Sequence, residues 1–282
     1  MLGLLIALTV TAPQAIPSAV YTDPVHDVAN PAGMEVLHIP SGGVEINAVA
    51  YLAAGAGPHP TLLIMHGLPG NEKNLDLAQA VRRAGWNAIT FNYRGSWGSP
   101  GHFSFAGNLE DGRNVLDYLR RPEVDSKLRI DRRRIVLAGH SMGDWVAALT
   151  AEADSGLAGV ILISGANMGY LGSTHAALVA DMATDMETLA TTTPDAMAAE
   201  LERNAGTFDW TPRAAGLGRT PLLVLSSDDG LAPNLGQLAK RVRASANSRV
   251  TEVHVATDHS WSDARIRLQS EVIGWLQALP RP

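Results

Sequence analysis

Apolar residues along this 282-residue chain alternate between two spacings. Short, wholly apolar runs such as residues 61–65 (TLLIM) are typical of strands that are buried on both faces of a sheet. Longer segments between these runs, such as residues 75–84, carry apolar residues at helical spacing, and this one stops at Gly85. The alternation predicts parallel strands that are joined by helical crossovers.

The predicted elements form one α/β core that is interrupted once. A hairpin is expected where Ser41-Gly42-Gly43 separates the first two strands. No apolar strand occurs between residues 165 and 218, so we expect a core of residues 21–164 and 219–282 with a helical lid or cap at 165–218. Strands are predicted at residues 34–40, 44–54, 61–65, 87–93, 134–138, 158–163, 221–226 and 250–255, and helices at 75–84, 109–119, 142–153, 176–190, 194–204, 235–244 and 261–279.

Composition indicates a globular protein and excludes several kinds of site. Hydrophobic residues make up 46% of the chain and charged residues only 18%, which suits a large core. The net charge is −6 and no block of Lys or Arg points to nucleic acid; we interpret the densest basic run, residues 132–134, as a solvated turn. The absence of Cys excludes disulfides, thiol chemistry and Cys-based zinc sites.

The first 20 residues stand apart from this core. Residues 2–10 are apolar and small residues follow them, which resembles a bacterial export signal, although only the terminal amine supplies positive charge. The alternatives are a periplasmic or secreted protein with an export signal and a cytoplasmic protein with an N-terminal arm. The stretch is too short to span a bilayer and no other segment approaches that length, so we expect no stable membrane insertion.

The motif that points most directly to chemistry is Gly139-His140-Ser141-Met142-Gly143, which lies between a strand-like run and a helix-favouring run. A Ser at G-x-S-x-G spacing on such a turn is typical of the nucleophile elbow of acyl-transfer enzymes. Side chains two positions either side of Ser141 would collide in so tight a turn, and the two glycines remove them. The following helix directs free N–H groups toward a developing oxyanion, so we predict the Met142 amide as one donor.

A serine nucleophile needs a base, and the base needs an orienting carboxylate. Because reacting groups gather at the carboxyl ends of parallel strands, the loops after the later strands supply the candidates. Asp228 and Asp229 follow one such strand, and His259 follows the next. His254 is the main rival for the base, but it lies within a predicted strand. Asp258 is interpreted as a loop residue.

These motifs together resemble those of the α/β hydrolases over about residues 34–280, in the serine esterase and serine aminopeptidase-like branch. The chain order Ser, Asp, His is the one that this family shows. Each of the five supporting motifs follows a predicted strand, and they occur in the family's order: His66-Gly67-Leu68-Pro69-Gly70, residues 93–99 (YRGSWGS), Gly139 to Gly143, residues 229–233 (DGLAP) and Asp258-His259.

The resemblance implies an α/β-hydrolase fold and a role for each site residue. Ser141 would be the nucleophile and His259 the general base and then general acid. Asp229 is favoured over Asp228 as the triad acid because Pro233 follows it at the family's spacing. The second oxyanion donor would be the Leu68 amide, and His66 would order that loop.

One residue departs from the family pattern, and four aromatic residues are candidate pocket residues. Asp144 stands where a third small residue is expected, and we predict that it points away from the pocket toward an Arg or a backbone donor. Four aromatic side chains flank catalytic loops or lie in the insertion and are candidates to line a substrate pocket, although Trp145 could equally be core: Trp97, Trp145, Tyr170 and Trp261.

The predicted function is hydrolysis of a small-molecule carboxylic ester through a Ser-His-Asp triad and an acyl-enzyme, without cofactor or metal. Two alternatives remain open, because the fold alone does not choose among them. One is a catalytically silent binding module. The other is a serine aminopeptidase-like peptidase or amidase, which would need an acidic lid residue to hold a substrate amine: Asp181, Asp185, Glu187, Glu200 or Glu202.

Overall fold

A computed structural model describes residues 15–169, 172–245 and 248–280 of the chain. These residues form a single eight-stranded sheet with strand order β1-β2-β4-β3-β5-β6-β7-β8. The first 14 residues of the predicted export signal, and Tyr170 of the predicted pocket, lie outside the described residues. The strands are β1 (Gly33–Ser41), β2 (Val44–Leu52), β3 (His59–Met65), β4 (Asn87–Phe91), β5 (Ile130–His140), β6 (Gly159–Ile163), β7 (Leu222–Ser226) and β8 (Val250–His254).

The strand pairing confirms the predicted α/β arrangement. β1 and β2 form the antiparallel hairpin, and β2 is also antiparallel to β4. From β4 through β8 every pair is parallel. All residues of β3, β4 and β6 are buried, as expected for strands covered on both faces.

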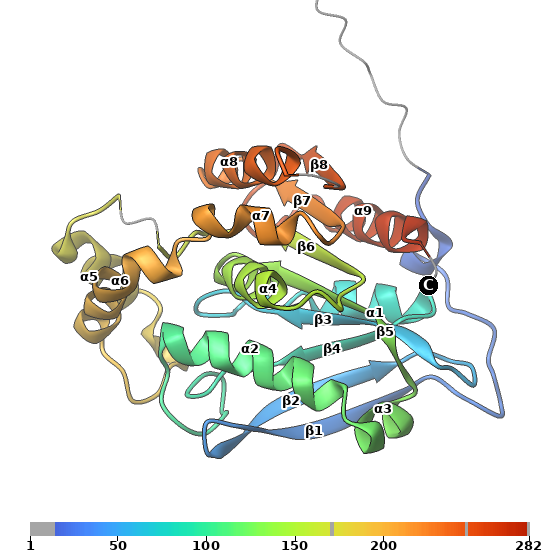
Figure 1. The fold of residues 1–282 in the computed structure, drawn as a ribbon. Helices are drawn as coiled ribbons and strands as arrows, with labels where there is room; N and C mark the ends of the chain where they lie inside the picture. The colour runs from blue at the N-terminus through green and yellow to red at the C-terminus, as the bar shows by residue number, and fades with distance from the viewer. Residues whose placement is uncertain (1–14, 170–171, 246–247, 281–282) are drawn as a thin grey trace, which may run out of the picture.

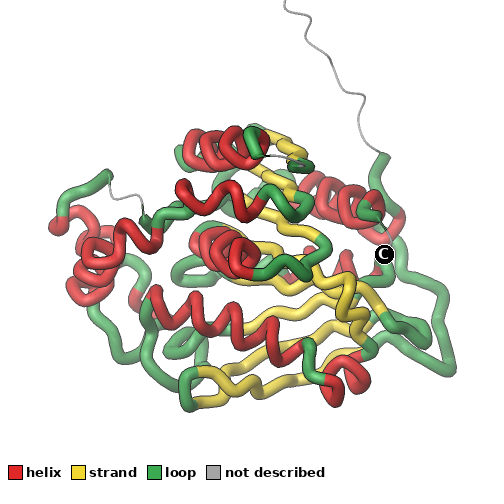
Figure 2. The backbone as a smooth tube through the Cα atoms, in the orientation of Figure 1, coloured by secondary structure: helices red, strands yellow, loops and turns green. Residues whose placement is uncertain are grey.

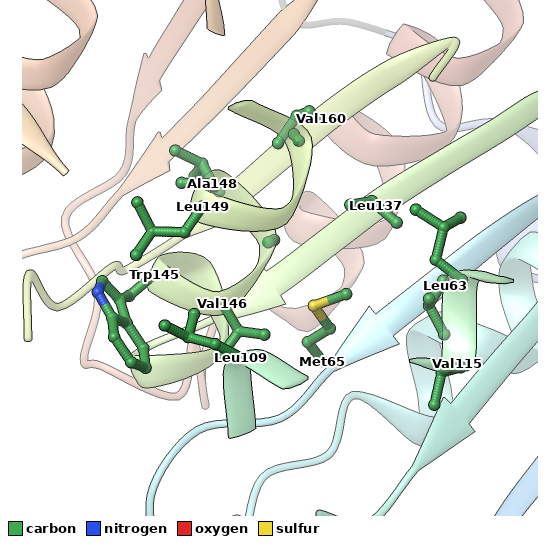
Figure 3. Close-up of a cluster of buried hydrophobic side chains, with 14 of the residues drawn as sticks. Leu63, Met65, Leu109, Val115, Leu137, Trp145, Val146, Ala148, Leu149 and Val160 are labelled. Carbon is green, nitrogen blue, oxygen red and sulfur yellow. The ribbon is translucent and has the colours of Figure 1, made fainter. Parts of the chain in front are cut away.

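Helices cover both faces of this sheet (Figures 1 and 2). One face packs against α1 and α9, around Leu77, Val272 and Ile273. The opposite face packs against α2, α4 and α8; Figure 3 shows part of that cluster, in which Val146 of α4 lies beside Met65 of β3. The helices of the core are α1 (Leu75–Arg83), α2 (Phe105–Leu119), α3 (Pro122–Leu128), α4 (Met142–Ala153), α8 (Ala232–Arg243) and α9 (Arg265–Ala278).

Several predicted helix boundaries are wrong. α2 begins at Phe105 and not at 109, because Ser104 caps it by accepting a hydrogen bond from the Gly107 amide. The final helix begins at Arg265 and not at 261, since Trp261 has a φ of +59° and cannot continue a helix. The short helix α3, which starts at Pro122, was not predicted.

The 165–218 insertion is helical, but its first helix is shorter than predicted. In place of one helix at 176–190 the chain forms α5 (His175–Ala183) and a 3-10 turn, η2 (Met186–Thr188). A second helix, α6 (Pro194–Phe208), lies beside α5 at one end of the molecule (Figure 1), and the short α7 (Ala214–Leu217) packs on α4. No helix in the described ranges is both long and apolar enough to cross a membrane.

Candidate active site

Ser141 occupies the strained turn between β5 and α4. Its φ of 58° and ψ of −122° lie outside the regions that non-glycine residues favour. The structure also shows why both flanking glycines are needed. A Cβ on Gly139 would lie 2.3 Å from the Asp144 amide nitrogen, and one on Gly143 would lie 2.1 Å from the Met65 carbonyl oxygen. The backbone therefore presents Ser141 at the carboxyl edge of the central sheet.

The loop after β3 lies against this serine. A Cβ on Gly67 would be only 2.8 Å from the Ser141 Cβ, so the chain carrying Leu68 passes directly beside the predicted nucleophile. His66 makes two contacts that hold this loop. Its Nδ1 donates to the Gly67 carbonyl oxygen at 2.7 Å, and its ring packs edge-on against the ring of Tyr93. Burial lowers the pKa of His66 to about 4, so its imidazole is neutral near pH 7.

Asp229 and His259 form a close pair. His259 Nδ1 donates to Asp229 Oδ2 at 2.7 Å, while the Leu231 amide donates to the other carboxylate oxygen at 2.9 Å. Burial alone would raise the pKa of Asp229, but these hydrogen bonds hold it below its ordinary value. The ionised carboxylate fixes the proton on Nδ1 and leaves His259 Nε2 free to accept one.

The rival residues form a separate, more exposed pair. His254 Nε2 contacts Asp228 Oδ1 at 3.0 Å, and its Nδ1 contacts the Ser226 hydroxyl at 3.0 Å. Both side chains are more than half exposed, whereas the Asp229 side chain is only 3% exposed. Asp258 accepts a hydrogen bond from the Ser262 amide and shapes the loop.

His140 joins the elbow to the His259 loop. Its Nε2 donates to the His259 carbonyl oxygen at 2.9 Å, and the two rings lie 4.8 Å apart between centroids. Burial lowers the pKa of His140 to about 4, which keeps the ring neutral. His259 is thereby held against the residue that precedes Ser141. Among the described residues, however, no hydrogen bond joins Ser141 Oγ to His259 Nε2.

Two serines behind this site were not anticipated from the sequence. Ser164 Oγ and Ser227 Oγ are 2.8 Å apart, and Ser227 helps to lower the pKa of Asp229. Trp261 Nε1 donates to Ser164 at 3.0 Å and closes the network. The sequence signal was weak: each serine directly follows a strand, as many turn residues do.

Asp144 binds a backbone donor, one of the two partners predicted for it. Its Oδ1 accepts a hydrogen bond from the Ile163 amide at 2.8 Å, which ties α4 to the end of β6. The side chain is fully buried, and Oδ2 lacks a hydrogen-bond partner among the described residues. Burial raises the pKa of Asp144 well above its ordinary value. Burial therefore favours the neutral acid over the carboxylate at this position.

Two of the predicted pocket residues belong to the core, which corrects that expectation. Trp145 is fully buried in the cluster that Figure 3 shows. It packs edge-on against Phe208 and donates to the Phe208 carbonyl oxygen. Trp261 is also fully buried, in the cluster beneath α9. Trp97 differs, because it lines a cavity and donates to the Pro69 carbonyl oxygen at 2.7 Å.

Within the described ranges, no group of three or more His, Asp or Glu residues is arranged to hold a metal ion. A strained serine, a histidine whose free nitrogen can take a proton and a buried carboxylate are the parts of a nucleophilic site.

A comparison with protein families matches residues 62–268 to the model described as "Alpha/beta hydrolase family". Solved structures with the same fold include EstE1, a thermostable carboxylesterase from a metagenomic library, with a TM-score of 0.68 and 20% identity over 94% of this chain and 93% of that one. An esterase from Pyrobaculum calidifontis has a TM-score of 0.66 and 18% identity over 93% of this chain and 88% of its own. At these identities the likeness extends to the fold alone.

Curated relatives match only part of the chain. An uncharacterised protein of Mycobacterium tuberculosis (strain ATCC 25618 / H37Rv) is 29% identical over 118 residues, which are 42% of this chain and 40% of the relative. Lysophosphatidylserine lipase ABHD12 of Rattus norvegicus is 30% identical over 100 residues, 34% of this chain and 23% of that protein. The match therefore spans less than half the length of either relative.

Proposed function

Because the chain belongs to the alpha/beta hydrolase family, we propose that it is a serine hydrolase that cleaves carboxylic esters through an acyl-enzyme. The observation that carries this proposal is the 2.7 Å hydrogen bond from His259 to Asp229, in a loop that His140 holds against the elbow of Ser141. An oriented imidazole beside a strained serine is the arrangement that nucleophilic catalysis requires.

In the proposed mechanism Ser141 attacks the ester carbonyl while His259 Nε2 takes the hydroxyl proton. The Oγ–Nε2 hydrogen bond would tighten when substrate binds, as such bonds commonly do. The Met142 and Leu68 amides would stabilise the oxyanion, and the loss of one such donor costs on the order of 3 kcal/mol. His259 then protonates the leaving alcohol, and water repeats the sequence on the acyl-enzyme.

Esters are the favoured substrates for two reasons. The similar solved structures include esterases, and lysophosphatidylserine lipase, named for an ester substrate, matches part of the chain. The 165–218 insertion would serve as a lid that limits the substrate to a small molecule. Thr188 of this insertion donates to the Pro69 carbonyl oxygen at 3.3 Å, and the segment 188–190 pairs with residues 95–97, so the lid contacts the predicted oxyanion loop.

The peptidase alternative is less favoured because two of its five candidate acids are already engaged. Glu200 accepts from the amides of Phe105 and Ala106 at the start of α2, and Glu202 contacts His175 at 3.0 Å. An amine-binding role would have to fall on Asp181, Asp185 or Glu187. Aminoacyl amides tested beside esters would reveal that activity.

The proposal is tested with Ser141→Ala and p-nitrophenyl butyrate. We expect more than 99% of the turnover to disappear, since one triad member supplies several orders of magnitude in rate. A fluorophosphonate should label the wild type at Ser141, as mapped by mass spectrometry. Ser126→Ala, in an exposed position on α3, is the matched control and should retain activity and labelling. A wild type that is neither labelled nor active would favour a silent binding module.

A further inference from the structure

A cavity of about 720 Å³ is lined by residues that follow two of the proposed catalytic loops in the chain. One wall is the loop that continues from Leu68, and it contributes Glu72 and Lys73. Another wall is Ser260, the residue directly after His259. Trp97 also lines the cavity and donates to the Pro69 carbonyl oxygen. The cavity is therefore bordered both by the chain that continues from the predicted oxyanion loop and by the chain that continues from the loop of the general acid.

The position of the cavity next to the His259 loop indicates which part of the substrate it would hold. In ester hydrolysis the general acid delivers its proton to the leaving oxygen, so the alcohol portion must lie next to the imidazole. The cavity borders the His259 loop through Ser260. It is accordingly suited to the alcohol side of the ester and not to the acyl chain.

The charges around the cavity are unevenly distributed. Arg265 donates from Nε to Asp76 at 2.9 Å and lies 3.7 Å from Glu72, so it satisfies both carboxylates of the cavity. Lys73 does not take part in these pairs: its Nζ lies 3.9 Å from the centroid of the Trp97 ring and donates to the Asn92 side-chain oxygen at 3.0 Å. No carboxylate oxygen of the described residues lies within 4.0 Å of that ammonium group.

The ammonium group thus retains unused donor capacity. Of its three N–H groups, one is directed to Asn92, and the Trp97 ring face offers attraction but no acceptor. Lys73 is half-buried, and a cation that is partly shielded from water interacts with an anionic ligand more strongly than a fully solvated lysine does. Asp76 and Glu72, which pair with Arg265, would not have to move for an anion to bind Lys73.

Resting on the proposed esterase function, we propose that the cavity binds the alcohol portion of the substrate and that Lys73 pairs with a negatively charged group on that alcohol. The chemical class is a carboxylic ester whose alcohol bears a phosphate or a carboxylate. Lys73 would determine specificity and take no part in bond making or breaking. Burial lowers the pKa of Lys73 to about 8, and a bound anion would raise that pKa again.

The test compares matched anionic and neutral esters. One pair is 1-butyrylglycerol 3-phosphate and monobutyrin, and the other is 4-butyryloxybenzoate and its methyl ester. For the wild type we expect kcat/KM to favour the anionic member by about tenfold or more, mainly through KM, as a charge-assisted hydrogen bond provides. In Lys73→Gln this ratio should fall at least about tenfold, and in Lys73→Arg it should be largely restored. A preference for only one of the two anions would identify which group the cavity accepts.

The control is Lys127→Gln, which removes the same charge from an exposed lysine of α3, at the opposite end of β5 from Ser141. It should leave the anionic-to-neutral ratio unchanged. A wild type without any anionic preference would overturn the proposal. So would a Lys73→Gln variant that slows both members of each pair equally, because that result would mean that Lys73 only supports the loop.

A binding experiment separates this proposal from the proposed function. Glycerol 3-phosphate is titrated into the wild type and Lys73→Gln by calorimetry, with glycerol as the neutral control. Binding that weakens at least about tenfold in the variant would support the cavity even if no ester were hydrolysed. Absence of glycerol 3-phosphate binding to an enzyme that does hydrolyse monobutyrin would reject the cavity and leave the esterase intact.

Discussion

At the residue scale, His140 is the side chain that connects the nucleophile elbow to the proposed general base. It is buried and neutral, and its single ring N–H donates a hydrogen bond to the His259 carbonyl oxygen. A residue so placed would act by positioning His259 and not by touching substrate. Its contribution should therefore appear in kcat and leave KM nearly unchanged.

We predict that His140→Phe lowers kcat on p-nitrophenyl butyrate about tenfold, since it keeps a ring but leaves the carbonyl oxygen unpaired. His140→Gln, whose amide can donate to the same oxygen, should recover most of that loss. Steady-state kinetics and a thermal unfolding curve check both variants. If the Phe and Gln variants lose the same activity, the ring contributes only packing.

The residues that could be predicted from the sequence are those whose position follows from the backbone. Ser141, Asp229 and His259 each follow a strand at the same edge of the sheet, so the strand pattern alone brings them near each other. Trp145 and Trp261 were misplaced because their direction depends on how a helix or turn is rotated about its axis, which only the packed structure fixes.

At the scale of elements, the insertion is attached to the core by polar contacts to backbone. Glu200 of α6 accepts hydrogen bonds from the first amides of α2, at 3.1 Å and 2.8 Å, and so supplies a cap from a distant part of the chain. The sequence could not reveal this contact, because a glutamate in α6 resembles any solvated helix residue. The break after Ala183 was hidden for a similar reason: the segment 188–190 leaves the helical pattern to pair with residues 95–97.

We predict that Glu200→Ala lowers the free energy of unfolding by about 1 to 2 kcal/mol, the usual range for the loss of a charged helix cap. The amides of Phe105 and Ala106 should exchange with deuterium faster, because they lose their acceptor. Urea unfolding and residue-resolved hydrogen exchange check these outcomes. Glu187→Ala, an exposed acid in the same insertion, is the control. If Glu200→Ala and Glu187→Ala lower the free energy of unfolding equally, the loss would reflect the charge of the insertion and not the cap on α2.

At the scale of the whole molecule, buried ionisable groups make stability depend on pH in opposite directions. His66 and His140 have pKa values of about 4 against an ordinary 6.5, because burial disfavours their charged form. The unfolded chain therefore binds more protons between pH 4 and 6.5, and stability falls as pH decreases through that window. Asp144 changes the stability in the opposite direction as pH varies. Burial raises its pKa well above 3.8, so the folded protein keeps a proton that the unfolded chain releases, and stability falls as pH increases.

Asp144→Asn separates these effects, because an amide keeps the acceptor for the Ile163 N–H and has no proton to lose. We predict that the variant is more stable than the wild type near neutral pH. Its advantage should grow as pH rises above the ordinary pKa of an aspartate, because only the wild type then has to ionise this buried group or keep it protonated. Urea unfolding at a series of pH values above that pKa provides the measurement, with Asp117→Asn at an exposed position of α2 as the control. A variant that is less stable than the wild type at every pH, or whose advantage does not change with pH, would contradict this account of Asp144.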